Sequence, residues 1–218
     1  MAFEQGYALL IGVGSYAHHR SLKVPITVAD AEEVKKVLID PRLCAYPDAH
    51  VRLLHDDSAN KQGVLDELEQ LGTQIKPEHT LTIFYAGHGV YGTDGNYYLT
   101  THDTRLDDGK VIPGTGISEG ELLEGLRKIK AKRLLLLFNA CHAGEISPSL
   151  GEEAEESIDS RSLPKRTAEA LLSAGEGRII LTACRPTQFS WFRREDRLTI
   201  FTQALVDGLS GKGGVASR

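Results

Sequence analysis

The stretch LLLLFNACHAGE, Leu134–Glu145, changes abruptly from an apolar run to small and polar residues. Leu134–Phe138 is apolar at every position, which is typical of a strand buried on both faces of a parallel sheet. Cys141 follows three residues after the run. The stretch therefore predicts a buried strand that ends by presenting a cysteine at the edge of a sheet.

The rest of the chain repeats this alternation of apolar runs and helical spacing. Four further runs read as buried strands, namely Tyr7–Val13, Val51–Leu54, Leu81–Tyr85 and Ile179–Ala183. Helical spacing is found at Val28–Ile39, Val64–Ile75 (capped by Ser58 or Asn60), Ser118–Ile129, Thr199–Leu209 and the shorter Thr167–Ser173. This order predicts an α/β fold with a mostly parallel central sheet and helices on both faces, and such folds place their chemistry at the carboxyl ends of the strands.

Composition and charge exclude several classes of protein. The 218 residues carry a net charge of -5 with both signs interspersed, which argues against a nucleic-acid-binding face because phosphate binding needs clustered Lys and Arg. No apolar run approaches the roughly 20 residues of a membrane span. Glu4 precedes only a short apolar run, unlike the basic start of a signal peptide. We expect a cytoplasmic protein that contacts neither nucleic acid nor membrane.

The spacing of the three cysteines does not indicate a disulfide framework. An odd number without a CxxC pair argues against disulfides and against a zinc site, so no metal site is predicted from them. Each is then either a small buried side chain or a reactive thiol. We interpret Cys44 as the former.

A second strand end carries a histidine. In LTIFYAGHGVYG, Leu81–Gly92, an apolar run ends at His88 with a glycine on each side, which lets the backbone turn sharply and leaves space around the imidazole. Two strands thus deliver His88 and Cys141 to one edge of a sheet. Only a thiolate attacks well, and an adjacent imidazole can take the thiol proton and return it to a leaving amine. The pair therefore indicates a cysteine nucleophile with a histidine base.

YAGHG and NACHAG resemble the histidine and cysteine motifs of the caspase-like cysteine peptidases, in particular their metacaspase-like branch. The resemblance extends through YALLIGVGSY, VADAEEV and RIILTACRPTQFSW to most of the chain. It implies a caspase-like α/β/α sandwich in which His88 is the general base and Cys141 the nucleophile. It also implies that the backbone N–H groups of Gly89 and Cys141 stabilise the oxyanion.

The same resemblance implies a substrate class. Metacaspases cleave after Arg or Lys by means of acidic pocket residues, and the first of these falls on Asp30. The second is replaced by Asn139, so weaker or altered selectivity is expected, because an amide offers only its oxygen to a guanidinium. Asp30 also suits a plain role as an acid near a helix N-terminus. By resemblance, Ser190 and Trp191 line the substrate cleft.

The chain is expected to form one caspase-like domain in three segments, excised from a longer protein. Residues 1–147 form a large-subunit-like part, 148–166 an exposed linker, and 167–218 a small-subunit-like part. The linker, acidic and then basic with two prolines, offers Arg161, Lys165 and Arg166 as self-cleavage sites in a zymogen. Basic residues are also common in any solvated loop.

Other interpretations stay open at this point. Asp103, Asp107 and Asp108 could supply oxygen ligands to Ca²⁺, although an acidic surface turn explains them better, and no cofactor is otherwise required. The expected partners are protein or peptide substrates, with a regulatory domain or activating partner. The alternatives are a non-proteolytic caspase-like adaptor, a thiol hydrolase acting on small amides or esters, and cleavage after Asp.

Overall fold

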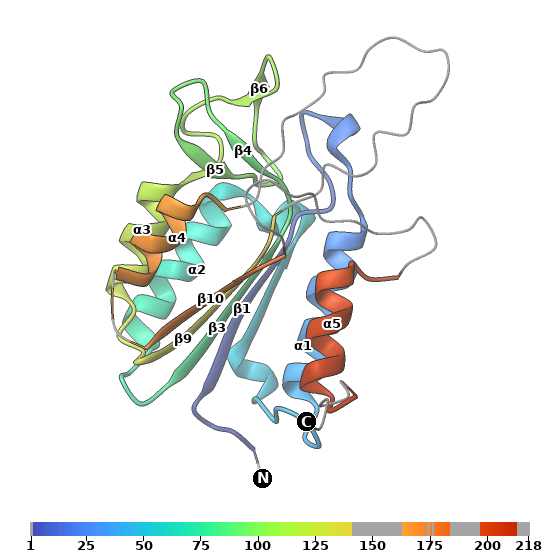
Figure 1. The fold of residues 1–218 in the computed structure, drawn as a ribbon, viewed down its shortest axis with the longest axis vertical. Coiled ribbons are helices and arrows are strands. Elements are labelled where there is room, and N and C mark those ends of the chain that lie inside the picture. Colours follow the sequence, from blue (N-terminus) through green and yellow to red (C-terminus); the bar gives the residue numbers. More distant parts are fainter. Residues whose placement is uncertain (1, 141–162, 174, 176, 184–196, 213–218) are drawn as a thin grey trace.

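The computed structural model describes residues 2–140, 163–173, 175, 177–183 and 197–212 (Figure 1). Four of the residues singled out above lie outside these ranges, namely Cys141, Arg161, Ser190 and Trp191. The account that follows concerns the described residues.

A five-stranded parallel sheet forms the centre of the molecule. Its strands are β1 (Gly6–Gly12), β2 (Val51–His55), β3 (Thr80–Ala86), β9 (Arg133–Asn139) and β10 (Arg178–Thr182). They lie in the order β10-β9-β3-β1-β2, and every neighbouring pair is parallel. The predicted parallel sheet is confirmed, and each predicted strand agrees with the observed one to within one residue at either end.

Helices cover both faces of this sheet, as the sequence predicts. Figure 1 shows α2 (Lys61–Gln74), α3 (Glu119–Lys128) and α4 (Lys165–Ser173) on one face, with α1 (Ile26–Ile39) and α5 (Ile200–Leu209) on the other. Apolar side chains of β1, β3 and β9 alternate between the two layers, so two core clusters form, one under each set of helices. The α/β/α sandwich is therefore confirmed.

The structure settles one helix start and corrects another. Asn60, rather than Ser58, caps α2, because its side chain accepts a hydrogen bond from the N–H of Gly63. Helix α4 begins at Lys165, two residues before the predicted start. Leu163 is buried in the core and Pro164 suits a helix start, so the chain is already packed where the sequence suggested an exposed linker.

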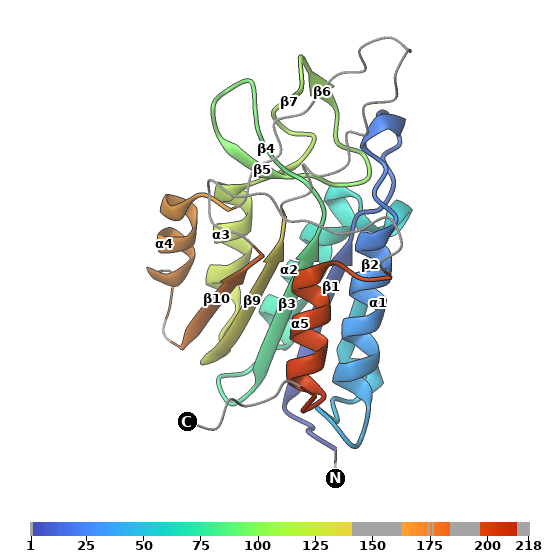
Figure 2. The same ribbon diagram turned by 45° about the vertical axis from the view of Figure 1, so that its right-hand side comes forward.

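Sequence analysis missed the small elements above the carboxyl edge of the sheet. They are the antiparallel strands β4 (Gly89–Tyr91), β5 (Tyr97–Leu99) and β8 (Ile117–Ser118), the hairpin of β6 (Leu106–Asp107) and β7 (Lys110–Val111), and the 3-10 turns η1 (Arg20–Leu22) and η3 (Asp56–Ala59) (Figure 2). A third 3-10 turn that the sequence analysis missed, η2 (Asp48–His50), lies at the opposite edge, directly before β2. Elements of two to four residues are too short to show a hydrophobic period.

The β6–β7 hairpin explains part of the acidic loop. Asp108 and Gly109 have φ angles of 46° and 70°, so both central residues of this two-residue turn are left-handed. Asp-Gly is a favoured sequence for such a turn. Asp107 and Asp108 are therefore accounted for as turn residues.

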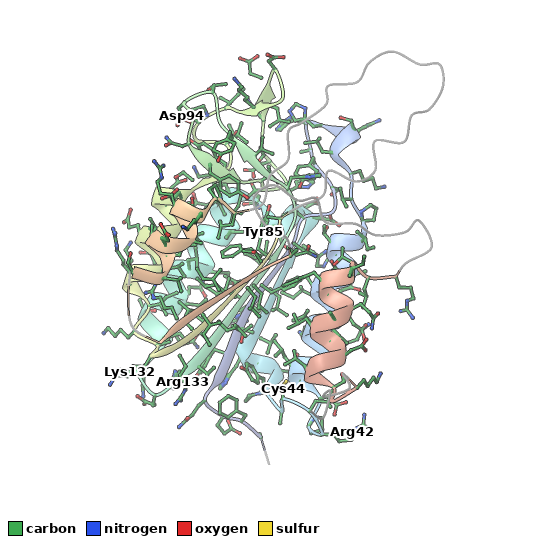
Figure 3. The ribbon with its side chains drawn as sticks, viewed as in Figure 1. Arg42, Cys44, Tyr85, Asp94, Lys132 and Arg133 are labelled. Atoms are coloured by element: carbon green, nitrogen blue, oxygen red, sulfur yellow. The ribbon has the colours of Figure 1, made fainter. Side chains whose placement is uncertain are left out.

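Two general expectations can be compared with the structure. No helix in the described ranges is both long enough and apolar enough to cross a bilayer. Cys44 is half-buried against the core layer under α1 and α5, and burial raises the pKa of its thiol. Figure 3 shows Cys44 at the opposite end of the sheet from Tyr85, which lies near the carboxyl edge.

Candidate active site

The pairing of β3 with β9 brings the two sequence motifs together. Ala86 pairs with Asn139 at the last position of both strands, so the chains leave the sheet at the same level. The contact continues beyond the strands, because the N–H of Gly87 donates to the carbonyl of Asn139 and that of Gly89 to the carbonyl of Ala140, both at 3.2 Å. The loop that carries His88 therefore lies against the residue that precedes Cys141 in sequence.

The imidazole of His88 is held from one side by the backbone. It is 4% exposed, and its Nε2 lies 3.1 Å from the carbonyl oxygen of Leu22, at the end of η1. A carbonyl can only accept, so Nε2 carries the proton and Nδ1 carries the lone pair. The ring of Tyr16 packs against the imidazole with the centroids 5.6 Å apart. This tautomer leaves Nδ1 as the nitrogen that can take a proton.

Burial keeps this imidazole neutral. It lowers the pKa of His88 from 6.5 to about 4, and the hydrogen bond to Leu22 offsets only part of that shift. At neutral pH a general base must be unprotonated, and His88 meets this requirement.

Sequence reasoning missed Leu22. Any residue at that position would offer the same backbone carbonyl, so no side-chain pattern identifies it. It becomes visible only because the segment between β1 and α1, which contains η1, lies against His88 in the structure.

The glycine before His88 is required for a reason other than a sharp turn. The φ angle of Gly87 is not positive. A Cβ built there would lie 2.5 Å from the hydroxyl oxygen of Tyr85 and 2.8 Å from its Cζ. Gly87 therefore allows the chain to pass directly over the Tyr85 ring on its way to His88.

The two predicted pocket residues, Asp30 and Asn139, are in direct contact. The side-chain nitrogen of Asn139 donates to Asp30 Oδ2 at 2.9 Å, and both residues are fully buried. Asp30 lies on α1 and Asn139 is the last residue of β9. The structure thus brings together residues that are 109 positions apart.

Thr199, the N-cap of α5, completes this buried cluster. Its N–H donates to Asp30 Oδ1 at 2.9 Å, and its hydroxyl donates to Asp30 Oδ2 at 2.8 Å. The hydroxyl also accepts from the amide of Asn139 at 2.8 Å. Asp30 lies on α1, but its carboxylate is bound at the N-terminus of a different helix, α5. Thr199 is a residue that the sequence analysis did not assign to this site.

The cluster leaves one acceptor without a partner. Both oxygens of Asp30 are occupied, whereas the buried Oδ1 of Asn139 has no hydrogen-bond partner in the part of the chain that the structure describes. Burial raises the pKa of Asp30 from 3.8 to about 6, and the interactions with Thr199, Thr202 and Asn139 oppose the rise. Asp30 is mainly ionised at pH 7 and places negative charge beside Asn139.

The described residues contain no group of three or more His, Cys, Asp or Glu side chains that could hold a metal ion. Asp103, the remaining member of the acidic loop, accepts from the N–H of Lys61 at 2.9 Å and from the hydroxyl of Thr101 at 2.8 Å. It thereby supports the start of α2. Calcium dependence stays a prediction without a set of ligands in these ranges.

Comparison with known proteins identifies the family. The sequence matches the peptidase C14 family, described as the caspase domain, over residues 5–216. The chain belongs to the caspase domain family. The family resemblance deduced from the two motifs is confirmed, and with it the membership of a family of cysteine peptidases. No curated protein sequence matches the chain significantly.

Solved structures show the same fold at low sequence identity. Protein GSU0716 from Geobacter sulfurreducens is 18% identical with a TM-score of 0.60, over 94% of this chain and 82% of that one. Caspase-1 from Spodoptera frugiperda is 18% identical with a TM-score of 0.58, over 95% and 69%. The structure of pro-sf-caspase-1 is 16% identical with a TM-score of 0.55, over 98% of this chain and 75% of that one. The caspase domain thus keeps its architecture here despite extensive sequence change.

The close approach at Gly87 yields a first prediction. We expect Gly87→Ala to lower kcat/KM by about 10²-fold, because a displacement of His88 by about 1 Å costs that much in a positioned site. The measurement is peptide hydrolysis by folded variants. Gly120→Ala on α3 is the matched control, because a Cβ there meets nothing within 4 Å. Equal activity of the two variants would contradict this role of Gly87.

The two buried ionisable groups predict opposite effects of acid on stability. Between pH 6.5 and 4 the unfolded state binds a proton at His88 that the folded state does not, so acidification lowers the free energy of unfolding. Between pH 6 and 3.8 the folded state binds the extra proton at Asp30, so the stabilisation from this group is present at low pH and is lost as the pH rises through about 6.

Urea unfolding at pH 7 and at pH 4.5 measures both effects. We expect the loss of stability on acidification to be smaller than in wild type for His88→Asn and larger for Asp30→Asn. His18→Asn is the matched control, because it replaces an exposed histidine by the same residue. If all three variants lose as much stability as wild type, the assigned pKa directions are wrong.

Proposed function

We propose that this chain is a cysteine endopeptidase in which Cys141 is the nucleophile and His88 the general base. The observation that carries the proposal is the geometry of His88. Its imidazole is buried, neutral and fixed through Nε2, and its loop contacts Ala140, the residue before Cys141. Membership of the caspase domain family supports the same assignment.

The reaction follows from these groups. The thiol proton passes to His88 Nδ1 while sulfur bonds to the scissile carbonyl carbon, and the carbonyl π electrons move to oxygen. The tetrahedral intermediate collapses as His88 returns the proton to the leaving amine, which leaves a thioester on Cys141. Water then attacks the thioester, with His88 again taking a proton, and releases the carboxylic acid and the thiol.

The oxyanion is assigned to the N–H groups of Gly89 and Cys141. The Gly89 N–H donates to the neutral carbonyl of Ala140 at 3.2 Å, the long end of the hydrogen-bond range. A negatively charged oxygen is a stronger acceptor than a carbonyl and would displace that contact.

Cleavage after Arg or Lys is the proposed specificity, with Asn139 as the recognising residue. Both oxygens of Asp30 are occupied, so its carboxylate is not available for a direct ion pair in this arrangement. Asp30 and Thr199 instead hold the amide nitrogen of Asn139, which leaves Asn139 Oδ1 as an acceptor with a negative charge behind it. A guanidinium or ammonium group suits such an acceptor, and an Asp side chain does not.

Self-cleavage of the segment between the two parts is proposed at Arg161. Lys165 and Arg166 occupy the first turn of α4, and a peptidase that binds its substrate extended would have to unwind that turn. Processing at Arg161 would make the chain a zymogen. The proposed partners are protein or peptide substrates and an activating partner, and the proposed location is the cytoplasm.

Hydrolysis of fluorogenic peptides that differ only in Arg, Lys or Asp before the scissile bond tests this function. We expect turnover after Arg or Lys, its complete loss in Cys141→Ala, and no loss in Cys44→Ala, whose thiol lies far from the carboxyl edge. Asn139→Leu should raise KM for the Arg peptide because it removes the acceptor. Each reaction is run with calcium and with chelator.

The other outcomes separate the alternatives. Wild-type turnover in Cys141→Ala would contradict the mechanism. Cleavage only after Asp would keep the mechanism and overturn the assignment of Asn139. Absence of any turnover, including after cleavage at Arg161, would favour a non-proteolytic adaptor.

A further inference from the structure

The backbone carbonyl of His88 accepts an unusual number of hydrogen bonds. Three donors reach it, namely the N–H of Thr100 at 3.0 Å, the hydroxyl of Thr100 at 3.0 Å and the hydroxyl of Tyr85 at 2.8 Å. A carbonyl oxygen has two lone pairs and commonly accepts one or two bonds. His88, Tyr85 and Thr100 are all buried. Two buried residues thus direct three donors at one carbonyl oxygen.

The donors belong to one connected network. The hydroxyl of Tyr16 lies 3.0 Å from that of Thr100, and because the Thr100 proton is directed at His88, Tyr16 is the donor of this pair. The Tyr16 oxygen in turn accepts from the N–H of His88 at 3.4 Å. Tyr85 also reaches the carbonyl of Thr100 at 2.8 Å, so its proton is shared between two acceptors. The network holds both peptide groups that flank His88.

The orientation of one carbonyl fixes the orientation of the next N–H. The described residues contain no cis peptide bond, so the N–H of Gly89 points away from the carbonyl of His88. With that carbonyl held toward Tyr85 and Thr100, the Gly89 N–H is directed at the end of β9. Its contact with the carbonyl of Ala140 agrees with this direction.

We propose that Tyr85 and Thr100 are positioning residues, which aim the N–H of Gly89 at the oxygen that becomes negative during acyl transfer. The inference rests on the proposed function. Tyr85 is the first residue of the YAGHG motif and Thr100 lies outside both motifs, and for neither residue does the motif or the family membership assign a role in the reaction. Hydrogen bonds to the His88 carbonyl also polarise the His88–Gly89 peptide, which strengthens its N–H as a donor. Donors fixed before the reaction stabilise an oxyanion without a cost of reorganisation.

Two reactions of the same thiol separate this role from a general structural one. Peptide hydrolysis passes through an oxyanion, whereas alkylation of Cys141 by iodoacetamide forms a carbon–sulfur bond with loss of iodide and needs no oxyanion donor. For Tyr85→Phe and Thr100→Val we expect kcat to fall about tenfold with KM unchanged, less than the roughly 10²–10³-fold cost of deleting a donor outright. The alkylation rate should equal that of wild type.

Matched variants control for folding and for the loss of a hydroxyl. Thr100→Ser keeps the hydroxyl and should retain the wild-type kcat. Tyr98→Phe removes a hydroxyl that donates to Asp94 in the turn between β4 and β5, and it should also leave kcat unchanged. Circular dichroism and urea unfolding verify that each variant is folded under the assay conditions.

Each outcome decides the inference. Wild-type kcat in both Tyr85→Phe and Thr100→Val would overturn it. A parallel fall in alkylation would also overturn it, because the network would then act through the His88 imidazole. If wild type itself shows no turnover that depends on Cys141, the proposed function fails, and that result is distinct from an active wild type with unaffected variants.

Discussion

The parallel pairing of β3 with β9 is the constraint on which the site depends. Leu81–Ala86 pairs residue for residue with Leu134–Asn139, and the apolar side chains on both faces lock this register under the helices. A slip by one residue would move every core side chain to the wrong face. The same register that protects the core therefore ends both strands at one level and sets the histidine loop against Ala140.

A second, buried interaction joins the two parts of the chain at this edge. Asp30 from α1, Asn139 from β9 and Thr199 from α5 share hydrogen bonds in the interior. A buried carboxylate is tolerated only when its lone pairs are satisfied, and the N-terminus of α5 supplies both a backbone N–H and a hydroxyl. The cluster links the N-terminus of α5 to the last residue of β9, so the packing of α5 and the position of the Asn139 side chain are coupled.

Much of the fold could be predicted from the sequence because its signals are strong and local. Five apolar runs and five segments of helical spacing predicted the sandwich, and the motif YAGHG placed His88 directly beyond a strand end, where the structure has it. The remaining elements are set by tertiary contacts. Lys165 and Arg166 looked like linker residues, because the burial of Leu163 that starts α4 cannot be recognised from a single apolar residue.

The site was only partly predictable for the same reason. Asp30 and Asn139 could be named from the sequence. The hydrogen bonds from Thr199 to the Asp30 carboxylate could not, because the two residues are 169 positions apart. Leu22 acts through a backbone carbonyl, which leaves no trace in residue type. Tyr85 is part of the YAGHG motif and Thr100 is part of neither motif, but only the convergence of their donors on the carbonyl of His88 gives the two residues a common role.

The central claim is that the β3–β9 pairing sets His88 to act on the thiol of Cys141. The most direct test is the rate of iodoacetamide alkylation of Cys141 between pH 5 and 9, in wild type and in His88→Asn. The account predicts rapid alkylation of wild type well below pH 8, and a variant whose rate rises only near the pKa of about 8.5 of an isolated thiol. Identical pH profiles for the two proteins would contradict it.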